Sequence, residues 1–389
     1  MRKVAIIGIG AVKAQPKTPT ISYKELTYKA AKLAYQDAHI THRDIDSFVT
    51  LAEDFNEGTA IFDEYTPDQL GAVLKPMQTI CHDGLVGIAN AYMQIASGLF
   101  DVVVVESHSK ISNLKNKASL EHYALDPNWV APLNMPAQAL AALEANCYAQ
   151  TLNVNGELEK ALGCVVTKNK ANAKKNPYAA YAKTVTAKEY EKSPSRFTPL
   201  KDIEIAPHAD GACVVVLASE DRIQKSNGSK PVWILGAGWA TETSEIGSKD
   251  WRRATYAKRA AQMAYKMAEI RDPKSEIDFF EIDDTYAFKE LQHLEALGVC
   301  EPGEAWKLTL KGVTQPNGAR PVNVSGGCLG LGETLETKGL YQVLEIVSQL
   351  RGGAGKRQLS KARRGLAFAW RGVPTTSGAC LILGANTLS

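Results

Sequence analysis

The stretch VAIIGIGAV at residues 4–12 returns as VWILGAGWA at residues 232–240, with both glycines in the same places. Each stretch alternates apolar residues in a way that is typical of a strand. Each then leads into a helical pattern, AAKLAYQDAHI at 30–40 and AAQMAYKMAEI at 260–270, and these two segments share six of eleven residues. The chain therefore contains an internal repeat of a strand followed by a helix.

Two further pairs extend this repeat in the same order. The segment IDSF at residues 45–48 matches IDFF at 277–280, and DGACVVVLAS at 210–219 matches SGACLILGAN at 377–386. Alternating strands and helices with valine-rich runs predict an α/β fold of two homologous halves, each with a mostly parallel sheet covered by helices on both faces.

We expect the first half to span residues 1–230 and the second half residues 231–389. The last matched pair is much closer together in sequence than the first, so the first half contains a long insertion, expected at about residues 112–205. Its polar, lysine-rich part at 166–194 is expected to lie on the surface, and a solvated helical face is its simplest interpretation.

The pair Gly8 and Gly10 follows a strand and resembles the start of a dinucleotide-binding motif. The third glycine is absent, and no acidic residue stands at the right place in a following strand to bind a ribose. We therefore expect these glycines to mark a place where two backbones crowd together.

Cys81 lies in TICHDGLVG, between an apolar strand tail and a long helical segment. Amide groups at a helix N-terminus favour thiolate over thiol and provide donors for an acyl oxygen. An inert buried cysteine is the alternative interpretation. The sequence offers Cys81 as a nucleophile.

Composition excludes several classes of protein. The chain has 389 residues, 45% hydrophobic and 22% charged, and a net charge of +3 that is too small to indicate nucleic-acid binding. Seven cysteines without paired spacing predict neither a disulfide framework nor a metal site, and favour the cytoplasm. The N-terminal pattern favours a strand over a signal peptide, and the uncharged stretch 84–100 a buried helix over a membrane span.

The Cys81 segment resembles the nucleophile helix of thiolases, where Cys-Ala-Ser-Gly opens the helix and a Gly-x-x-Asp-Val-Val-Val strand follows. More motifs resemble the sterol-carrier-protein type of thiolase, in family order: Lys168-Asn169-Lys170, Asn176-Pro177, Asp210-Gly211-Ala212, residues 281–298, 323–327 and 349–367. The resemblance covers nearly the whole chain. It implies a thiolase fold, a five-layered αβαβα arrangement with a loop domain inserted in the first half. It also implies a homodimer, and a small zinc-ribbon/OB-fold partner subunit in a larger complex.

Both family histidines are replaced by acids. The histidine of the family motif Glu-x-His-Asp-Cys-Phe is Asp283 here, and Glu333 replaces the histidine of Gly-His-Pro. The second family cysteine falls around residues 369–370, where this chain has none. Cys81 is the only catalytic residue of the family that this chain retains.

Carboxylates at Asp283 and Glu333, if ionised, would repel a thiolate and cannot donate a hydrogen bond to an oxyanion. A shared proton resolves this conflict, with Glu333 protonated as a donor and Asp283 ionised as a base. Tyr286 is expected as a further catalytic donor, with His82 and His208 in reserve.

The remaining expected contacts bind the substrate. The backbone amides of Cys81 and Gly372 are expected to hold the acyl oxygen. The glycine loop of Ser325, Gly326 and Gly327 is expected to admit the pantetheine arm. Four lysines are expected to bind the CoA phosphates: Lys168, Lys170, Lys174 and Lys175. No bound cofactor is expected, because coenzyme A or its thioester is the substrate.

The leading hypothesis is an enzyme that makes or cleaves a C–C bond of a (3-keto)acyl-CoA through an acyl intermediate on Cys81. One alternative is a CoA-dependent retro-aldolase that uses carboxylate or tyrosine bases. The other alternative is a non-catalytic acyl-CoA-binding subunit of a larger complex.

Overall fold

The computed structural model describes residues 2–53, 61–123, 125–152, 154, 156–223, 229–372 and 376–387. Elements of the first half are β1 (Val4–Ala11), α1 (Tyr23–Ala38), β2 (Ser47–Leu51), α3 (Phe62–Tyr65), α4 (Pro67–Leu70), β3 (Met77–Ile80), α5 (Gly84–Ala96), β4 (Val102–Ser109), β5 (Gly211–Ser219) and α10 (Glu220–Ile223). Between β4 and β5 lie α6 (Lys117–Tyr123), α7 (Ala137–Leu152), α8 (Glu157–Ala173) and α9 (Ala187–Glu191).

The second half repeats the strand–helix pattern. Its elements are β6 (Val232–Thr241), α11 (Thr255–Met267), α12 (Pro273–Glu276), β7 (Phe279–Ile282), α13 (Ala287–Ala296), α14 (Ala305–Leu310), α15 (Gly327–Leu331), α16 (Lys338–Arg351), β8 (Arg364–Arg371) and β9 (Ser377–Gly384). Every matched sequence segment falls on corresponding elements, so the predicted duplication is confirmed. The boundary at residue 230 stays a prediction.

The strand order is β3-β2-β4-β5-β1-β6-β9-β8-β7, in which the two halves mirror each other. Within the first half β5 runs antiparallel to both neighbours, and the other four strands share one direction. Within the second half β9 plays the same part. The halves are therefore mostly parallel in strand direction, as predicted, with one reversed strand each.

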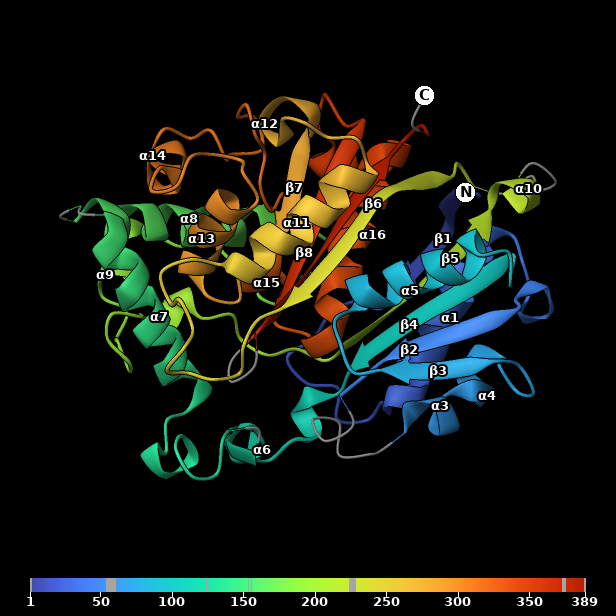
Figure 1. Ribbon diagram of the computed structural model, residues 1–389, viewed down its shortest axis with the longest axis horizontal. Helices are drawn as coiled ribbons and strands as arrows, with labels where there is room; N and C mark the ends of the chain where they lie inside the picture. Colours follow the sequence, from blue (N-terminus) through green and yellow to red (C-terminus); the bar gives the residue numbers. More distant parts are fainter. Residues whose placement is uncertain are drawn as a thin grey trace.

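The layers follow from which helices cover which strands. Helix α1 packs on β1 and β5, and α11 packs on β6 and β9, so each forms an outer layer. Helices α5 and α16 contact each other and strands of both halves, which places them in the central layer (Figure 1). The predicted five-layered α/β fold is confirmed. The stretch 84–100 contains α5, a helix buried among apolar strands, and no helix in the described ranges is long and apolar enough to span a membrane.

Paired glycines set the distance between strand and outer helix in both halves. A Cβ at Gly8 would overlap the Ala34 carbonyl oxygen of α1, and a Cβ at Gly238 would overlap the Ala260 carbonyl oxygen of α11. The strands of both pairs also carry a register shift just before the first glycine. These glycines therefore allow close backbone packing, as expected, because any side chain would push the helix outward.

The insertion differs from the expected surface excursion. Helix α8 carries a buried face that includes Val165, Val166 and Ala173, and it packs on α14 and α15 of the second half. Its lysines also turn inward, as described below. The polar sequence of this helix wrongly predicts surface exposure, because the partners of its buried charges lie far away in the chain.

Gly238→Ala tests the close packing in β6. The added methyl would overlap the Ala260 carbonyl oxygen and lie 2.6 Å from the Met263 Cβ. We expect a loss of about 1–3 kcal/mol in the free energy of unfolding, measured by urea denaturation. Gly247→Ala is the matched control, because its Cβ would meet nothing within 4 Å. Equal stability of the two variants would contradict the packing argument.

Candidate active site

Cys81 lies in the short connection between β3 and α5, and its side chain is exposed. Its carbonyl oxygen accepts a hydrogen bond from Arg371 Nη1 at 2.8 Å, at the end of β8. Asp83 caps α5 by accepting from the Leu85 amide at 2.8 Å, and its other oxygen accepts from the Gly339 amide at 3.3 Å. These contacts hold the Cys81 segment between the end of β8 and the start of α16.

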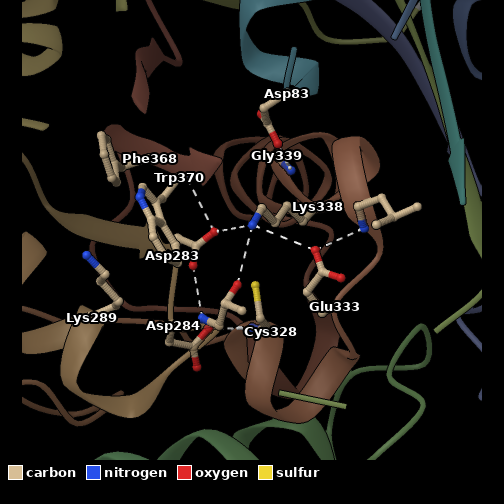
Figure 2. Close-up of polar contacts among 12 residues, drawn as sticks. Asp83, Asp283, Asp284, Lys289, Cys328, Glu333, Lys338, Gly339, Phe368 and Trp370 are labelled. Carbon is tan, nitrogen blue, oxygen red and sulfur yellow. Dashed lines mark hydrogen bonds and ion pairs between the residues drawn. The ribbon is translucent and has the colours of Figure 1, made fainter. Parts of the chain in front are cut away.

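A buried cation lies beside this segment. Lys338 is the first residue of α16, and its side chain is 8% exposed. Its Nζ lies 2.8 Å from Asp283 Oδ2 and 3.8 Å from Glu333 Oε1, and it donates to Thr285 Oγ1 at 3.4 Å. Figure 2 shows the ammonium group between the two carboxylates. Lys338 is not among the site residues predicted from the sequence, although both of its acidic partners are.

Asp283 is completely buried and its oxygens are fully engaged. Besides Lys338, it accepts hydrogen bonds from the Thr285 amide at 2.9 Å and the Trp370 amide at 3.3 Å. A carboxylate held in this way is suited to a fixed electrostatic role. The predicted role of Asp283 as an ionised base stays a prediction, and its three contacts favour the fixed electrostatic role.

The expected protonation of Glu333 is wrong, because neighbouring groups lower its pKa. Burial raises the pKa of Glu333, but the charge of Lys117, the hydrogen bond with His208 and the charge of Lys338 outweigh burial and hold it well below the usual range. Burial lowers the pKa of Lys338, but Asp283 and Glu333 outweigh burial and raise it well above the usual value. Glu333 is thus an anion at neutral pH, and Lys338 is a permanent cation.

His208 completes the network from the end of the insertion. Its Nδ1 lies 2.9 Å from Glu333 Oε2, and its side chain is 46% exposed. Backbone hydrogen bonds on both sides fix this segment, from the Ala206 amide to Thr285 O at 2.8 Å and from the Ala209 amide to Glu333 O at 2.9 Å. Because an ionised carboxylate only accepts, Nδ1 carries the proton and Nε2 is left as the acceptor nitrogen.

A pocket of about 560 Å³ opens beside this network. Its lining includes His208, Glu333, Lys338, Tyr286 and Trp370, with Gly372 at the edge. The Tyr286 and Trp370 rings meet edge to face, with centroids 6.1 Å apart. Burial, with the charges of Glu121 and Glu333, raises the pKa of Tyr286, so the phenol stays protonated and can donate.

The predicted pair Cys81 and Gly372 is linked through Arg371, at the end of β8. Arg371, which binds the Cys81 carbonyl, stands between Trp370 and Gly372, and both of these residues line the pocket. A Cβ at Gly372 would overlap the Trp370 ring, so only glycine fits there. Gly372 lines the pocket, whereas Cys81 is not among its lining residues, so their shared role as an oxyanion hole stays a prediction.

His82 contributes less than expected. It accepts a hydrogen bond from the Asp83 amide at Nδ1, at 2.8 Å. Burial lowers the pKa of His82 to about 4, so the imidazole is neutral at pH 7. It therefore cannot serve as a cationic acid.

Two of the four predicted phosphate lysines are corrected. Lys168 is buried and ion-paired with Glu290 at 2.6 Å, and Lys170 is buried and donates to the Leu329 carbonyl at 2.8 Å. Their ammonium groups are committed inside the protein. Lys174 and Lys175 are exposed and stay candidates for CoA phosphates.

The predicted pantetheine loop is also corrected. Ser325 donates to Glu281 at 2.5 Å, and all three loop residues are buried. Gly326 and Gly327 have positive φ angles of 106° and 57°, and their α-carbons face Ala173 and Asp284 so closely that a Cβ would overlap either one. These glycines are required by a tight internal turn and leave no space for a ligand arm.

This chain is similar to several known proteins. Residues 238–385 match the family model described as Thiolase C-terminal domain-like. The acetyl-CoA acetyltransferase of Methanothermobacter thermautotrophicus is 28% identical over 374 residues, which cover 94% of this chain and 95% of that protein. Sterol carrier protein 2 of Bos taurus is 27% identical over 93% of this chain and 68% of its own length. A solved Ltp2-ChsH2(DUF35) aldolase matches with a TM-score of 0.82 at 25% identity, covering 98% of this chain and 97% of that chain.

Asp83→Asn tests the buried acid that caps α5. Burial, reinforced by the charge of Asp283 and opposed by Lys338 and two amides, raises the pKa of Asp83 to about 7. Because the pKa of Asp83 is higher in the folded than in the unfolded state, the protonated carboxyl stabilises the folded protein below the unfolded pKa, near 4. This stabilisation is lost as the pH rises through about 7. Asparagine keeps the capping oxygen and cannot ionise. We therefore expect the stability of the variant relative to wild type to rise between pH 4 and 7, by on the order of a few kcal/mol.

Urea unfolding at a series of pH values measures this difference. The stability difference between wild type and Asp83→Asn below pH 4 is the control, because the side chain at position 83 is neutral in both proteins there. A difference that stays constant across the range would contradict the raised pKa of Asp83.

Proposed function

The chain belongs to the thiolase superfamily and is of the sterol-carrier-protein type, and on that premise we propose that it is a thiolase-like acyltransferase. The proposed reaction makes or cleaves a C–C bond of a 3-ketoacyl-CoA, with the thiol of Cys81 as the acyl acceptor. CoA and its thioesters act as dissociable substrates, and Lys174 and Lys175 are the proposed contacts for the CoA phosphates.

The position of Cys81 carries this proposal. The hydrogen bond from Arg371 ties the cysteine backbone to the strand end whose residues Trp370 and Gly372 line the pocket. The contact of Asp83 with Gly339 ties the same segment to the first turn of α16, next to Lys338. An acyl group on Cys81 would therefore stand between the amide of Gly372 and the charged network.

The proposed cleavage is a balanced acyl transfer. His208 Nε2 takes the proton of the Cys81 thiol, and the resulting thiolate attacks the keto carbon of the substrate. The bond between C2 and C3 breaks, and its electron pair leaves as an enolate on the shorter CoA thioester. The protonated His208 gives this proton to C2 through Nε2. His208 then takes the proton of a second CoA thiol, whose sulfur takes the acyl group from Cys81, and passes it to the released Cys81 thiolate, which closes the cycle.

Glu333 and Lys338 support this proton transfer without joining it. Glu333 accepts from Nδ1 of His208, which fixes the orientation of the ring and leaves Nε2 to take and give the proton. Lys338 neutralises one unit of the negative charge of Asp283 and Glu333, so a developing enolate meets less repulsion. The His208–Glu333 pair would thereby replace one of the two missing family histidines.

A retro-aldolase is the second candidate. Its support is the likeness to the solved aldolase, together with a pocket that holds Tyr286 and His208 as a proton donor and an acceptor. In this reaction His208 takes the hydroxyl proton of a 3-hydroxyacyl-CoA, the bond between C2 and C3 breaks, and the resulting enolate is protonated by Tyr286. No covalent bond to Cys81 is needed.

We also propose assembly as a homodimer, together with a small partner subunit. The solved relative is an Ltp2-ChsH2(DUF35) aldolase. Its DUF35 component supports the zinc-ribbon/OB-fold partner subunit that the family resemblance implies. A non-catalytic role as an acyl-CoA-binding subunit is the outcome expected if no chemistry is found with or without such a partner.

Intact-mass analysis tests the acyl intermediate. We expect a panel of 3-ketoacyl-CoAs to leave an acyl adduct on the wild-type chain, and Cys81→Ser to abolish it. Cys164→Ser is the matched control, because this partly exposed cysteine lies in the insertion and should leave the adduct unchanged. Full turnover of 3-hydroxyacyl-CoAs by Cys81→Ser would contradict the acyl-enzyme and establish the retro-aldolase.

His208→Gln tests the proton carrier. Loss of a positioned acid or base lowers a rate by about 10²–10⁴-fold, so we expect exchange of the C2 hydrogens of a bound acyl-CoA with D₂O to slow by that factor. The measurement is the mass gained by the acyl-CoA with time. His39→Gln, at the C-terminal end of α1, is the control and should exchange at the wild-type rate. Unchanged exchange in His208→Gln would contradict its proposed role.

A further inference from the structure

A second cavity, of about 770 Å³, lies on the outer face of the second half. It is bounded by α11 from Thr255 to Tyr265, by α13, and by the segments around residues 272–274 and 297–302. None of its lining residues also lines the pocket beside Lys338. The proposed acyl transfer makes no use of it.

Cationic side chains dominate the lining of this cavity. Five cationic and three carboxylate side chains contribute: Arg252, Arg253, Lys258, Arg259, Lys274, Asp272, Glu295 and Glu301. Two of the cations are already in ion pairs, Lys274 with Glu301 and Arg252 with Asp250. Within the described chain no carboxylate pairs with the other three. Because Asp250 neutralises Arg252 and Glu301 neutralises Lys274, the lining keeps an excess of about one positive charge over Asp272 and Glu295.

The start of α11 adds backbone donors to the same place. This helix has 13 residues, and no side chain caps its N-terminus at Ala254. Residues 252–255, which include this N-terminus, line the cavity. The free amide groups and the helix dipole of such a terminus favour an anion.

An unsatisfied buried donor at the cavity wall is the decisive observation. Gln292 lines the cavity, yet its side chain is 2% exposed. Its Oε1 accepts from Lys289 Nζ at 2.8 Å, which fixes the orientation of the amide, and its Nε2 has no hydrogen-bond partner. A buried amide group without a partner is unfavourable, so a ligand acceptor at this place would satisfy it.

From these features we propose that the cavity binds a multiply charged phosphate, such as pyrophosphate or a phosphate ester. Arginine forks and helix N-terminal amides both suit phosphate oxygens, and three cations without a carboxylate partner attract an anion. Gln292 Nε2 donates to one ligand oxygen at the floor of the site. Arg253, Lys258 and Arg259 provide the charge at its rim.

Titration calorimetry with inorganic pyrophosphate, and separately with inorganic phosphate, tests this site on the full chain. We expect saturable binding of pyrophosphate to one site, and a dissociation constant at least about 5–10-fold higher in Lys258→Gln and in Arg253→Gln. Lys266→Gln is the matched control, because it removes an exposed cation of α11 that does not line the cavity. Its dissociation constant should stay within about twofold of the wild-type value.

Gln292→Leu separates a built site from general attraction to positive charge. We expect weaker pyrophosphate binding in this variant than in wild type, with unfolding by urea showing that the chain still folds. If it does not fold, the two rim variants decide the matter. Absence of saturable binding, or equal weakening in Lys266→Gln, would overturn the proposal. So would binding that is lost in Arg196→Gln, which lines the other pocket, and kept in Lys258→Gln.

Discussion

A buried ammonium group between two buried carboxylates is the interaction on which the candidate active site depends. Lys338 lies 2.8 Å from Asp283 and 3.8 Å from Glu333. Removal of one partner from such a buried pair typically costs about 3–5 kcal/mol, because the remaining charge stays in the interior without compensation. Glu333 in turn orients His208, so the placement of the proposed proton carrier also depends on Lys338.

The duplicated fold explains why these groups meet. Helices α5 and α16 occupy corresponding places in the two halves and share the central layer. Their N-termini come together where Asp83 of one half accepts from the Gly339 amide of the other. Cys81 precedes the first helix and Lys338 begins the second, so the site is assembled at the contact between the two repeats. Glycines in β1 and β6 let the outer helices α1 and α11 pack closely on the strands.

Sequence patterns predicted the fold far better than the site. The repeat, the central helix after Cys81 and the crowded glycines follow from local periodicity, which the structure preserves. The partners of charged residues do not follow from local periodicity, because they depend on packing between segments far apart in the chain. Lys168 and Lys170 resemble surface lysines in sequence, yet Glu290 and the Leu329 carbonyl are supplied by the other half. Lys338 was missed for the same reason, as a single lysine at the start of an apolar helix.

A double-mutant cycle on Lys338 and Asp283 tests the central claim most directly. The free energy of unfolding at pH 7 is measured for wild type, Lys338→Met, Asp283→Asn and the double variant. If the ion pair holds the site together, the double variant loses less stability than the sum of the single variants, with a coupling energy of about 1–3 kcal/mol. Losses that add to within about 0.5 kcal/mol would contradict the account.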